Sequence, residues 1–342
     1  MDSDFTIIKN PEAIDRLKWS EFILNHDDGN VFHMPEYFDL CNSIPEYSGV
    51  ALFCIKENEI FGILVSVIQR ESSGILGKVT ARSVIRGGPL IKDNDPKITS
   101  LLIAEYNKLV SPKALFSEFR NLKDMSLFGT SFHSNGYKFE DHLDIHINLS
   151  NGKDVVWMEM YPVRRRQINR SVKLGIRVSI AEPEKQGVME SCYKLLKSVY
   201  KKAGVPLPKI DYFMYAAKIL GTNGMFRLFI VEDDSNIIGF MMALCFKGVV
   251  YEWYVAASNQ DNDKYPNTIL LWEIFSWGID NGYKIFDFGG AGKPDKPYGV
   301  RDYKKRFGGE MINLGRYSIV HKKALYAIIM SGYKVRKKII TK

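Results

Sequence analysis

Apolar residues in the first half of the chain group into segments with strand and helix periodicity. The segments 50–55 and 60–67 are almost wholly apolar, and Glu57-Asn58-Glu59 between them supplies a turn, so they predict a β-hairpin. A helix predicted over 96–109 precedes a strand over 114–119. A hairpin, a helical crossover and a further strand indicate a mixed α/β module.

The second half of the chain begins this order again and extends it. Its predicted strands lie at 142–149, 226–231, 237–246, 249–255 and 284–288. Its predicted helices lie at 155–174, 188–203, 210–220, 266–280 and 301–306. Short turns join the three central strands, which predicts that they pair antiparallel. Strand, helices, three antiparallel strands, helix, strand and helix is similar to the order of elements in the acetyltransferase-like (GNAT) fold.

The length and composition of the chain suit two domains. With 342 residues, 46% of them hydrophobic, the chain can bury two cores of ordinary size. We therefore predict an α/β (α+β) fold of two tandem GNAT-like modules, each a mixed, mostly antiparallel sheet flanked by helices. The expected bounds are 1–139 and 140–316, followed by a basic, amphipathic C-terminal segment over 317–342.

Charge favours a polyanionic partner. The net charge is +8 and the pI is near 9.0, which suits tRNA, a nucleotide-linked substrate or an anionic membrane. Basic residues flank the apolar stretch 324–330: Lys322, Lys323, Lys334, Arg336, Lys337, Lys338 and Lys342. That pattern predicts either a helix on a membrane surface or a packed terminal helix with a solvated basic end.

The remaining composition indicates a cytoplasmic protein. The four cysteines are widely scattered and form no CxxC pair, as is typical of reduced thiols: Cys41, Cys54, Cys192 and Cys245. The N-terminus lacks the basic start and apolar core of a signal peptide, and no apolar run approaches the roughly 18 residues of a membrane span. We expect the protein in the cytoplasm or at the inner face of the membrane.

Five blocks in the second half occur in a specific order. They are Tyr251-Glu-Trp-Tyr254, 265–273, Phe286-Asp-Phe-Gly-Gly290, 299–304 and Phe307-Gly-Gly-Glu310. Together they resemble the C-terminal signature of the Fem-type aminoacyltransferases. The basic segment 161–175 is similar to the helix that opens the second module of that family, and Arg86-Gly-Gly-Pro89 to a short segment of its first module.

The resemblance implies transfer of an acyl or aminoacyl group from an activated donor to an amine, without a covalent enzyme intermediate. The acceptor would be a nucleotide- or lipid-linked precursor of peptidoglycan or of another envelope glycan. No tightly bound cofactor is expected, and the donor co-substrate would be aminoacyl-tRNA or acyl-CoA. The long coiled-coil arm of some family members is absent, which weakens tRNA as the carrier, and Arg301-Asp302 departs from the usual pattern.

Two residues are the candidates for catalysis. A lysine is expected at position 304 in the family motif, where it would neutralise a donor phosphate or the oxyanion. The run Lys304-Lys305-Arg306 equally suits a solvated surface. Asp287 stands where a strand meets Gly289-Gly290, so it would orient the amine or act as a base, or else cap the glycine turn through backbone amides.

Further candidates would bind substrate. Glu252 and Tyr254 are two residues apart on one strand and are therefore predicted to share a face, opposite Tyr251 and Trp253. Arg165 and Arg166 lie on a basic helix, where guanidinium forks suit a diphosphate and a solvated face is the alternative. The other candidates are Asn267 at a helix start, where capping is the alternative, Gly289, Gly290 and Tyr303.

Other chemistries find little support. His142, Asp144 and His146 share a strand face, but a fourth ligand is missing from the pattern, so no metal is predicted. No activating histidine stands near a cysteine in the sequence, and the glycines at 289–292 do not form a Walker P-loop. The Arg/Gln-x-x-Gly-x-Gly/Ala motif of CoA-dependent GNAT enzymes is not intact. Two alternatives remain, an acyl-CoA-dependent N-acyltransferase acting on an amino sugar and a non-catalytic adaptor for RNA or membrane.

Overall fold

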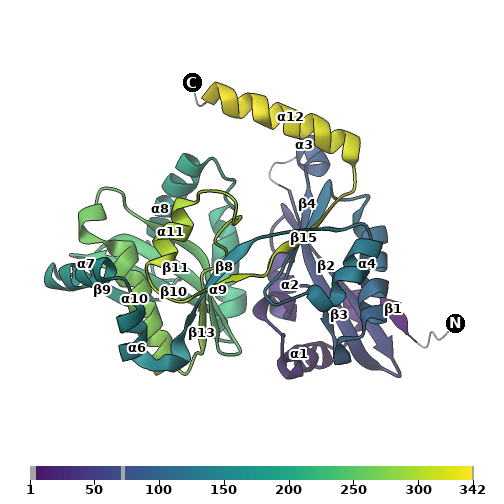
Figure 1. Ribbon diagram of the computed structural model, residues 1–342, viewed down its shortest axis with the longest axis horizontal. Coiled ribbons are helices and arrows are strands. Elements are labelled where there is room, and N and C mark those ends of the chain that lie inside the picture. The colour runs from purple at the N-terminus through teal and green to yellow at the C-terminus, as the bar shows by residue number, and fades with distance from the viewer. Residues whose placement is uncertain (1–4, 71–73, 341–342) are drawn as a thin grey trace. The chain divides into compact units, whose positions relative to one another are not determined.

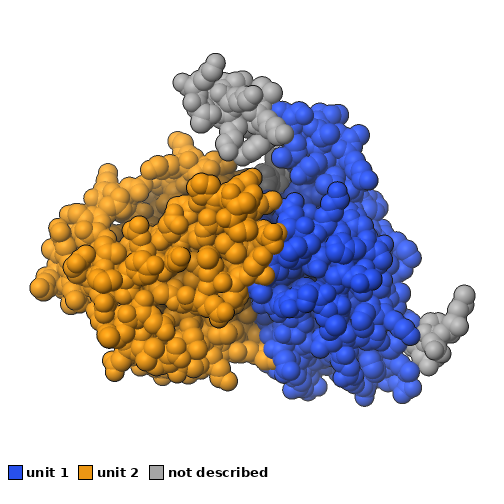
Figure 2. All heavy atoms as spheres, in the orientation of Figure 1, with its two compact units in different colours: residues 1–140, 314–342 blue, residues 141–313 orange. Residues whose placement is uncertain are grey.

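The computed structural model describes residues 5–70 and 74–340, and the chain divides into two compact units (Figures 1 and 2). The first unit comprises residues 1–140 and 314–342, and the second comprises residues 141–313. Each unit contains one mixed sheet flanked by helices, and each is described by itself below.

The sheet of the first unit is built around a long hairpin. Its strands run in the spatial order β1 (Thr6–Ile8), β2 (Tyr47–Lys56), β3 (Glu59–Gln69), β4 (Arg82–Arg86), β6 (Phe116–Arg120), β15 (Arg316–Val320) and β7 (Lys138–Glu140), with β5 (Leu90–Ile91) beside β3. Alternation along β2 sends Leu52 to the core beneath helix α4 (Pro96–Val110) and Phe53 to Trp19 of α1 (Arg16–Asn25). The remaining helices are α2 (Pro35–Asn42), α3 (Gly74–Val79), α5 (Gly129–Ser134) and α12 (Lys323–Ile340).

The sheet of the second unit has seven strands. Their spatial order is β14 (Glu310–Asn313), β8 (Leu143–Asn148), β13 (Ile285–Asp287), β12 (Val249–Ala257), β11 (Asn236–Phe246), β10 (Phe226–Asp233) and β9 (Arg177–Ala181). Helices α8 (Val188–Ala203) and α9 (Ile210–Gly221) pack on β10 to β12. Helix α10 (Pro266–Asp280) packs on the same strands and also contacts α6 (Gly152–Glu159) and α7 (Pro162–Lys173). The short helix α11 (Gly299–Lys305) follows β13.

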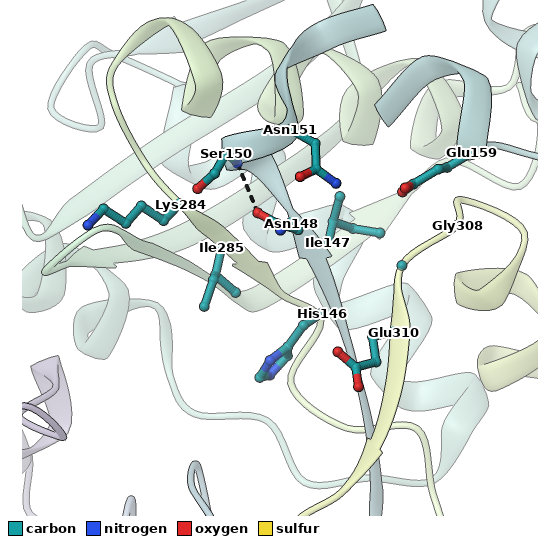
Figure 3. A pocket seen from close by; sticks show the side chains of 11 residues that line it. His146, Ile147, Asn148, Ser150, Asn151, Glu159, Lys284, Ile285, Gly308 and Glu310 are labelled. Atoms are coloured by element: carbon teal, nitrogen blue, oxygen red, sulfur yellow. Dashed lines mark hydrogen bonds between the residues drawn. The ribbon is translucent and has the colours of Figure 1, made fainter. Parts of the chain in front are cut away.

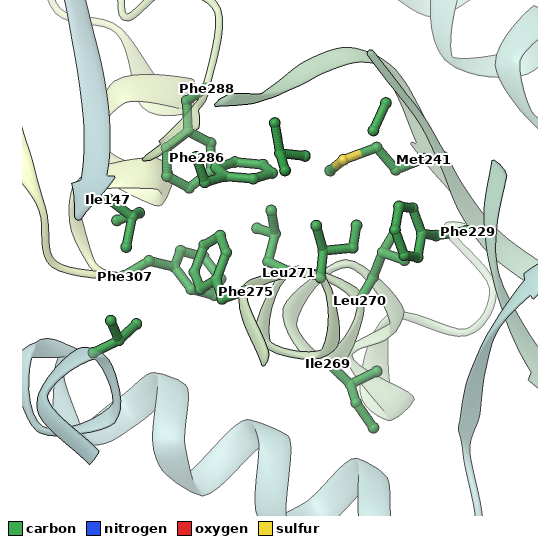
Figure 4. Close-up of a cluster of buried hydrophobic side chains, with 14 of the residues drawn as sticks. Ile147, Phe229, Met241, Ile269, Leu270, Leu271, Phe275, Phe286, Phe288 and Phe307 are labelled. Atoms are coloured by element: carbon green, nitrogen blue, oxygen red, sulfur yellow. The ribbon is translucent and has the colours of Figure 1, made fainter. Parts of the chain in front are cut away.

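The core of the second unit positions the strand that carries Asp287. Phe286 and Phe288 are buried against Phe275 of α10, and Phe307 closes the same cluster (Figure 4). Because neighbouring side chains on a strand point to opposite faces, Asp287 is directed away from this apolar cluster. The Phe-Asp-Phe pattern therefore fixes the side of the sheet on which the carboxylate lies.

Three sequence expectations differ from the structure. The helix predicted over 155–174 is two helices, because the chain turns at Met160 and Tyr161 and Pro162 begins a new helix at its first position. The short strands β9 and β14 are not among the strands predicted from the sequence. Strand β15 pairs with β6 and β7, so residues 314–316 join the first unit rather than the second module.

The C-terminal segment forms α12 over residues 323–340. In its described part, Tyr326 contacts the ring of Phe116, whereas Ile328 is 70% exposed. The side chains of 332–340, which include Lys334, Arg336, Lys337 and Lys338, and residue Lys342 lie outside the described part. Within residues 5–70 and 74–340, no helix is long and apolar enough to cross a membrane.

Candidate active site

The strands β12 and β13 part from each other in the middle of the second sheet. They pair in parallel only over residues 249–251 and 285–287, and β12 then continues to Ala257 while β13 ends. The chain leaves β13 through Gly289 and Gly290, whose φ angles are +70° and +116°. Backbone of this kind favours glycine, and a Cβ on Gly289 would lie 3.1 Å from the Glu252 carbonyl oxygen. The turn thus closely approaches β12 where the strands separate.

A β-bulge in β12 lies at the same level. The pairing with β11 shifts between Met242, opposite Tyr254, and Ala243, opposite Glu252, so Trp253 is the extra residue. Trp253 and Tyr254 consequently both contact the ring of Phe213, at centroid distances of 6.1 and 4.8 Å. The prediction that Glu252 and Tyr254 share a face is wrong, because the bulge interrupts the two-residue period.

Lys304 of α11 is buried where β12 and β13 part, a place called the opening below. Its ammonium lies 3.0 Å from Glu252 Oε1 and donates to the carbonyl oxygens of Phe288, at 2.5 Å, and Gly290, at 3.3 Å. The side chain is only 9% exposed, so it is not the solvated lysine that its basic neighbours suggested. Burial raises the pKa of Glu252, which the positive charge of Lys304 opposes. The ion pair joins β12 to the residues that follow β13.

A second polar cluster lies on the other side of the glycine turn. Asp287 Oδ1 accepts from the backbone N–H of Gly289 at 2.6 Å, and Asp144 Oδ1 accepts from Gly290 at 2.9 Å and Ile145 at 2.7 Å. The remaining carboxylate oxygen Oδ2 of Asp287 lies 3.6 Å from His146 Nε2. Asp287 therefore caps the turn, as one sequence interpretation held, and also faces an imidazole.

Burial and mutual repulsion determine the protonation of this cluster. Asp144 and Asp287 are 6% and 2% exposed. Burial, together with the charge of Asp287, raises the pKa of Asp144 to about 7. Burial alone would lower the pKa of His146, but the facing carboxylates of Asp287, Asp144 and Glu310 outweigh it and raise that pKa above its usual value. The group therefore exchanges protons near neutral pH.

Two strands that the sequence separates widely supply the three side chains, Asp144 and His146 from β8 and Asp287 from β13. Among the described residues they are the one group of three or more His, Cys, Asp or Glu in which one ligand atom from each residue lies within 4.8 Å of the others, a spacing that suits a shared proton or a cation. The sequence pattern placed His142, Asp144 and His146 on one face. The structure instead adds Asp287, while His142 Nε2 would lie 3.5 Å from a Cβ on Gly290.

His146 also lines a hollow of about 680 Å³ on the second unit (Figure 3). Strand β14 pairs with β8 only as far as Glu310 opposite His146, and the glycines before it turn the chain away. The lining is mixed: Ile147 and Ile285 lie beside two carboxylates, Glu159 and Glu310, one ammonium, Lys284, and the polar residues His146, Asn148, Ser150 and Asn151. The imidazole of His146 is 22% exposed, so it connects the buried carboxylates to this hollow.

The arginines of α7 occupy different environments. Arg164 is buried, stacks on the ring of Tyr303 at 4.0 Å and donates to the Tyr303 carbonyl oxygen at 3.2 Å. Arg165 contacts Met158 Sδ at 3.7 Å, and Arg166 is exposed. The guanidinium that reaches the site is thus Arg164, which sequence reasoning did not select. Burial raises the pKa of Tyr303, whose hydroxyl lies 3.4 Å from Thr268, to about 12.

Asn267 lies in the first turn of α10. The residue before the helix is Tyr265, whose side chain makes no capping hydrogen bond, and Asn267 is at the second helical position. Its Oδ1 is buried and has no hydrogen-bond partner. The alternative of a capping asparagine is therefore wrong, and its Oδ1 is a buried, unpartnered acceptor beside the α10 N-terminus.

A nucleophilic cysteine is incompatible with the buried thiols. All four cysteines are buried and unpaired. Burial raises the pKa of Cys192 and Cys245 to about 12, so their thiolates are scarce at neutral pH.

The sequence of the second unit matches a known domain family. Residues 163–305 match the acetyltransferase (GNAT) domain. This stretch includes β9 to β13, the parting of β12 and β13, and Lys304. The chain has a tandem GNAT fold. The match supports an acyltransferase of the GNAT type, as the resemblance had implied. No curated protein matches the sequence.

Solved structures resemble the chain over nearly its whole length. FemX is 14% identical with a TM-score of 0.71, covering 92% of this chain and 98% of FemX. L-PGS from Bacillus licheniformis is 16% identical with a TM-score of 0.58, covering 90% and 92% of the two chains. A tandem GNAT protein from the clavulanic acid biosynthesis pathway is 8% identical with a TM-score of 0.58, covering 93% and 98%. The predicted fold of two GNAT-like modules is confirmed, and FemX shares that fold.

Proposed function

We propose that the second unit transfers an acyl or aminoacyl group from an ester or thioester donor to an amine of a cell-wall or envelope-glycan precursor. The observation that carries the proposal is the parting of β12 and β13 beside a glycine turn, with Lys304 and Glu252 buried at its base. A parted strand offers backbone N–H groups that are not used in the sheet, and such donors stabilise the oxyanion formed during acyl transfer.

In this proposal Lys304 positions the opening rather than touching the donor. Its ammonium has three donors and already has three acceptors, so binding a phosphate or an oxyanion would require it to leave one of them. Its charge still favours the developing oxyanion through the low-dielectric interior. The non-catalytic adaptor is less well supported, because binding RNA or membrane gives no reason to bury an ion pair and two carboxylates.

The donor and the acceptor are held by groups around this opening. The N-terminus of α10 suits the donor's phosphates, since backbone N–H groups at a helix start favour anions. The unpartnered Oδ1 of Asn267 beside it is an acceptor and suits a hydroxyl or N–H group of the donor. The exposed guanidinium of Arg166, with Arg165 beside it, suits the diphosphate of a nucleotide- or lipid-linked acceptor. In the first unit, considered by itself, the basic residues at the start of α12 suit an anionic membrane.

An N-acyltransferase that uses acyl-CoA and acts on an amino sugar is the second candidate. The match of residues 163–305 to an acetyltransferase domain favours it. The two candidates differ in the donor, so the donor decides between them.

Three measurements test the proposal. Calorimetry with acetyl-CoA beside free CoA tests the acyl-CoA donor, and micromolar binding favours the amino-sugar enzyme. Mass spectrometry of reactions with acetyl-CoA or alanyl-tRNA, each with an amino-sugar or a peptidoglycan precursor, detects the new amide. If neither donor yields an amide with either acceptor, the proposed function is wrong. Sedimentation with anionic liposomes tests the membrane partner, and failure to pellet at low salt removes it.

A further inference from the structure

We propose that His146 accepts the proton of the attacking amine, and that the hollow beside it binds a polar acceptor through its ammonium group. This inference rests on the proposed function and names the acceptor side of the same site. Sequence analysis had assigned the amine to Asp287. In the structure that carboxylate is buried and faces His146.

Asp287 cannot reach an acceptor directly. It is 2% exposed, its Oδ1 is bonded to Gly289, and its Oδ2 faces His146 at 3.6 Å. His146 is the member of the cluster that reaches the hollow. An imidazole that is oriented by a buried carboxylate and partly open to a pocket is the arrangement of a general base. Asp287 and Asp144 are positioning residues in this assignment.

The hollow suits an amine with neighbouring polar groups. Glu310 is directly opposite His146 across the β8–β14 pair, and Glu159 lines the same space. Two carboxylates attract an ammonium, whereas Asn148, Ser150 and Asn151 offer groups that hydrogen-bond to hydroxyl or amide substituents. An amino sugar carries both kinds of group.

The glycine turn places the two polar clusters side by side. The N–H groups of Gly289 and Gly290 bind Asp287 and Asp144, while the carbonyl oxygen of Gly290 accepts from Lys304 at the parted strands. The turn therefore joins the residues that contact Lys304 to the carboxylates that face His146. A side chain at Gly289 would crowd the carbonyl oxygen of Glu252, which a Cβ would approach to 3.1 Å.

The reaction balances with no further reactant. Neutral imidazole takes one proton from the ammonium, and the amine nitrogen forms a bond to the donor's carbonyl carbon. The carbon–sulfur or carbon–oxygen bond to the donor then breaks. The second amine proton passes to solvent, and the leaving thiolate or alkoxide takes a proton from the imidazolium, which restores the neutral base.

The pH dependence follows from the groups that face His146. These are Asp144 on the same strand, Asp287 on β13 and Glu310 on β14, with Tyr251 of β12 paired to Asp287. All three carboxylates favour the imidazolium, so the acid limb of kcat/KM lies above the ordinary histidine value of about 6.5. Replacing Glu310 by Gln removes one of the three charges and moves that limb to lower pH.

The test combines NMR and kinetics on the full chain. The ring resonances of His146, assigned by loss in His146→Gln, are titrated with and without glucosamine in the wild type and in Glu310→Gln. We expect glucosamine to shift the His146 resonance and Glu310→Gln to lower its midpoint. In the transfer reaction, His146→Gln should lower kcat by about 100- to 10,000-fold. His142→Gln is the matched control and should leave both readouts unchanged.

The outcomes separate this inference from the proposed function. If the wild type makes an amide and His146→Gln has the same kcat and the same acid limb of its pH profile, the role assigned to His146 is wrong. A His146 resonance that ignores glucosamine at millimolar concentration overturns the acceptor site. Loss of transfer in EDTA with recovery on adding Mn²⁺ or Zn²⁺ would show that the cluster binds a metal instead. Absence of transfer by the wild type counts against the proposed function alone, since the NMR titration needs no donor.

Discussion

Replacing Lys304 by Met tests whether the buried ion pair holds the parted strands. The change keeps most of the side-chain volume and removes the ammonium, which leaves Glu252 Oε1 and the carbonyl oxygens of Phe288 and Gly290 without their donor. Removing one member of a buried pair costs about 3–5 kcal/mol, because the other charge stays buried. We expect a loss of that size in the free energy of unfolding at pH 8.

The loss should be smaller at pH 5. Burial already raises the pKa of Glu252, and removal of Lys304 raises it further. For a carboxyl with a raised pKa in the folded state, stability is present at low pH and declines as pH rises through the folded pKa. Protonated Glu252 is neutral and needs no counter-charge, so acidic conditions relieve part of the defect.

A double replacement separates the charge from the packing. In Lys304→Met with Glu252→Gln, only the two carbonyl oxygens lack a donor, so we expect a loss of about 1–3 kcal/mol, smaller than that of Lys304→Met alone. Lys305→Met is the matched control: Lys305 is exposed, and its replacement should change stability by less than about 0.5 kcal/mol. Urea unfolding followed by tryptophan fluorescence measures the stability of these three variants and of the wild type. If Lys304→Met is as stable as Lys305→Met, or if the double variant is the least stable, the Lys304–Glu252 ion pair does not hold the parted strands.

Three other replacements test the buried carboxylate and the two environments of the arginines. Asp144→Asn should raise Tm at pH 8 and raise it less at pH 5, because the folded-state pKa of about 7 means that stability present at low pH is lost as pH rises through 7. Equal effects at both pH values in thermal unfolding would contradict this. Arg164→Lys loses the stacking on Tyr303 and should cost about 1–2 kcal/mol, whereas Arg166→Gln should keep stability and raise KM for a diphosphate-linked acceptor. Similar unfolding curves for the two arginine variants would refute the distinction.

The sequence predicted the elements that local pattern determines. The apolar hairpin of β2 and β3, the three antiparallel strands β10 to β12 and the helix after Pro266 follow from alternation and turns, and the alternation of Phe286, Asp287 and Phe288 correctly placed a carboxylate at a strand end. The order of these elements was enough for the fold, because the GNAT order is itself specific.

The site depends on pairing that no local pattern encodes. The β-bulge at Trp253 shifts Tyr254 away from the face of Glu252, and a bulge is visible only in the register with β11. Lys304 is buried beside the exposed Lys305 because α11 directs only one of the two toward β12. The role proposed for His146 depends on its contact with Asp287, a residue 141 positions later in the sequence.

Strand β15 shows a long-range dependence that is testable by truncation. It lies between β6 and β7 in the first sheet, although it follows the whole second unit in the sequence. Tyr317 on this strand is 4% exposed and stacks on Phe132 with ring centroids 4.0 Å apart. Ending the chain at residue 313 removes the strand, its backbone pairing on both sides and this ring.

A chain that ends at residue 322 keeps β15 and lacks only α12, so it is the matched control for the one that ends at 313. Burial of Tyr317 alone contributes about 2–3 kcal/mol, and β7 loses the strand with which it pairs. We expect the 1–313 chain to unfold at clearly lower urea than 1–322 in its first unit, while the second unit, which retains all seven strands, unfolds as in the full chain. Proteolysis with mass mapping tells the two units apart. If the 1–313 and 1–322 chains resist urea and protease equally, β15 does not contribute to the stability of the first unit.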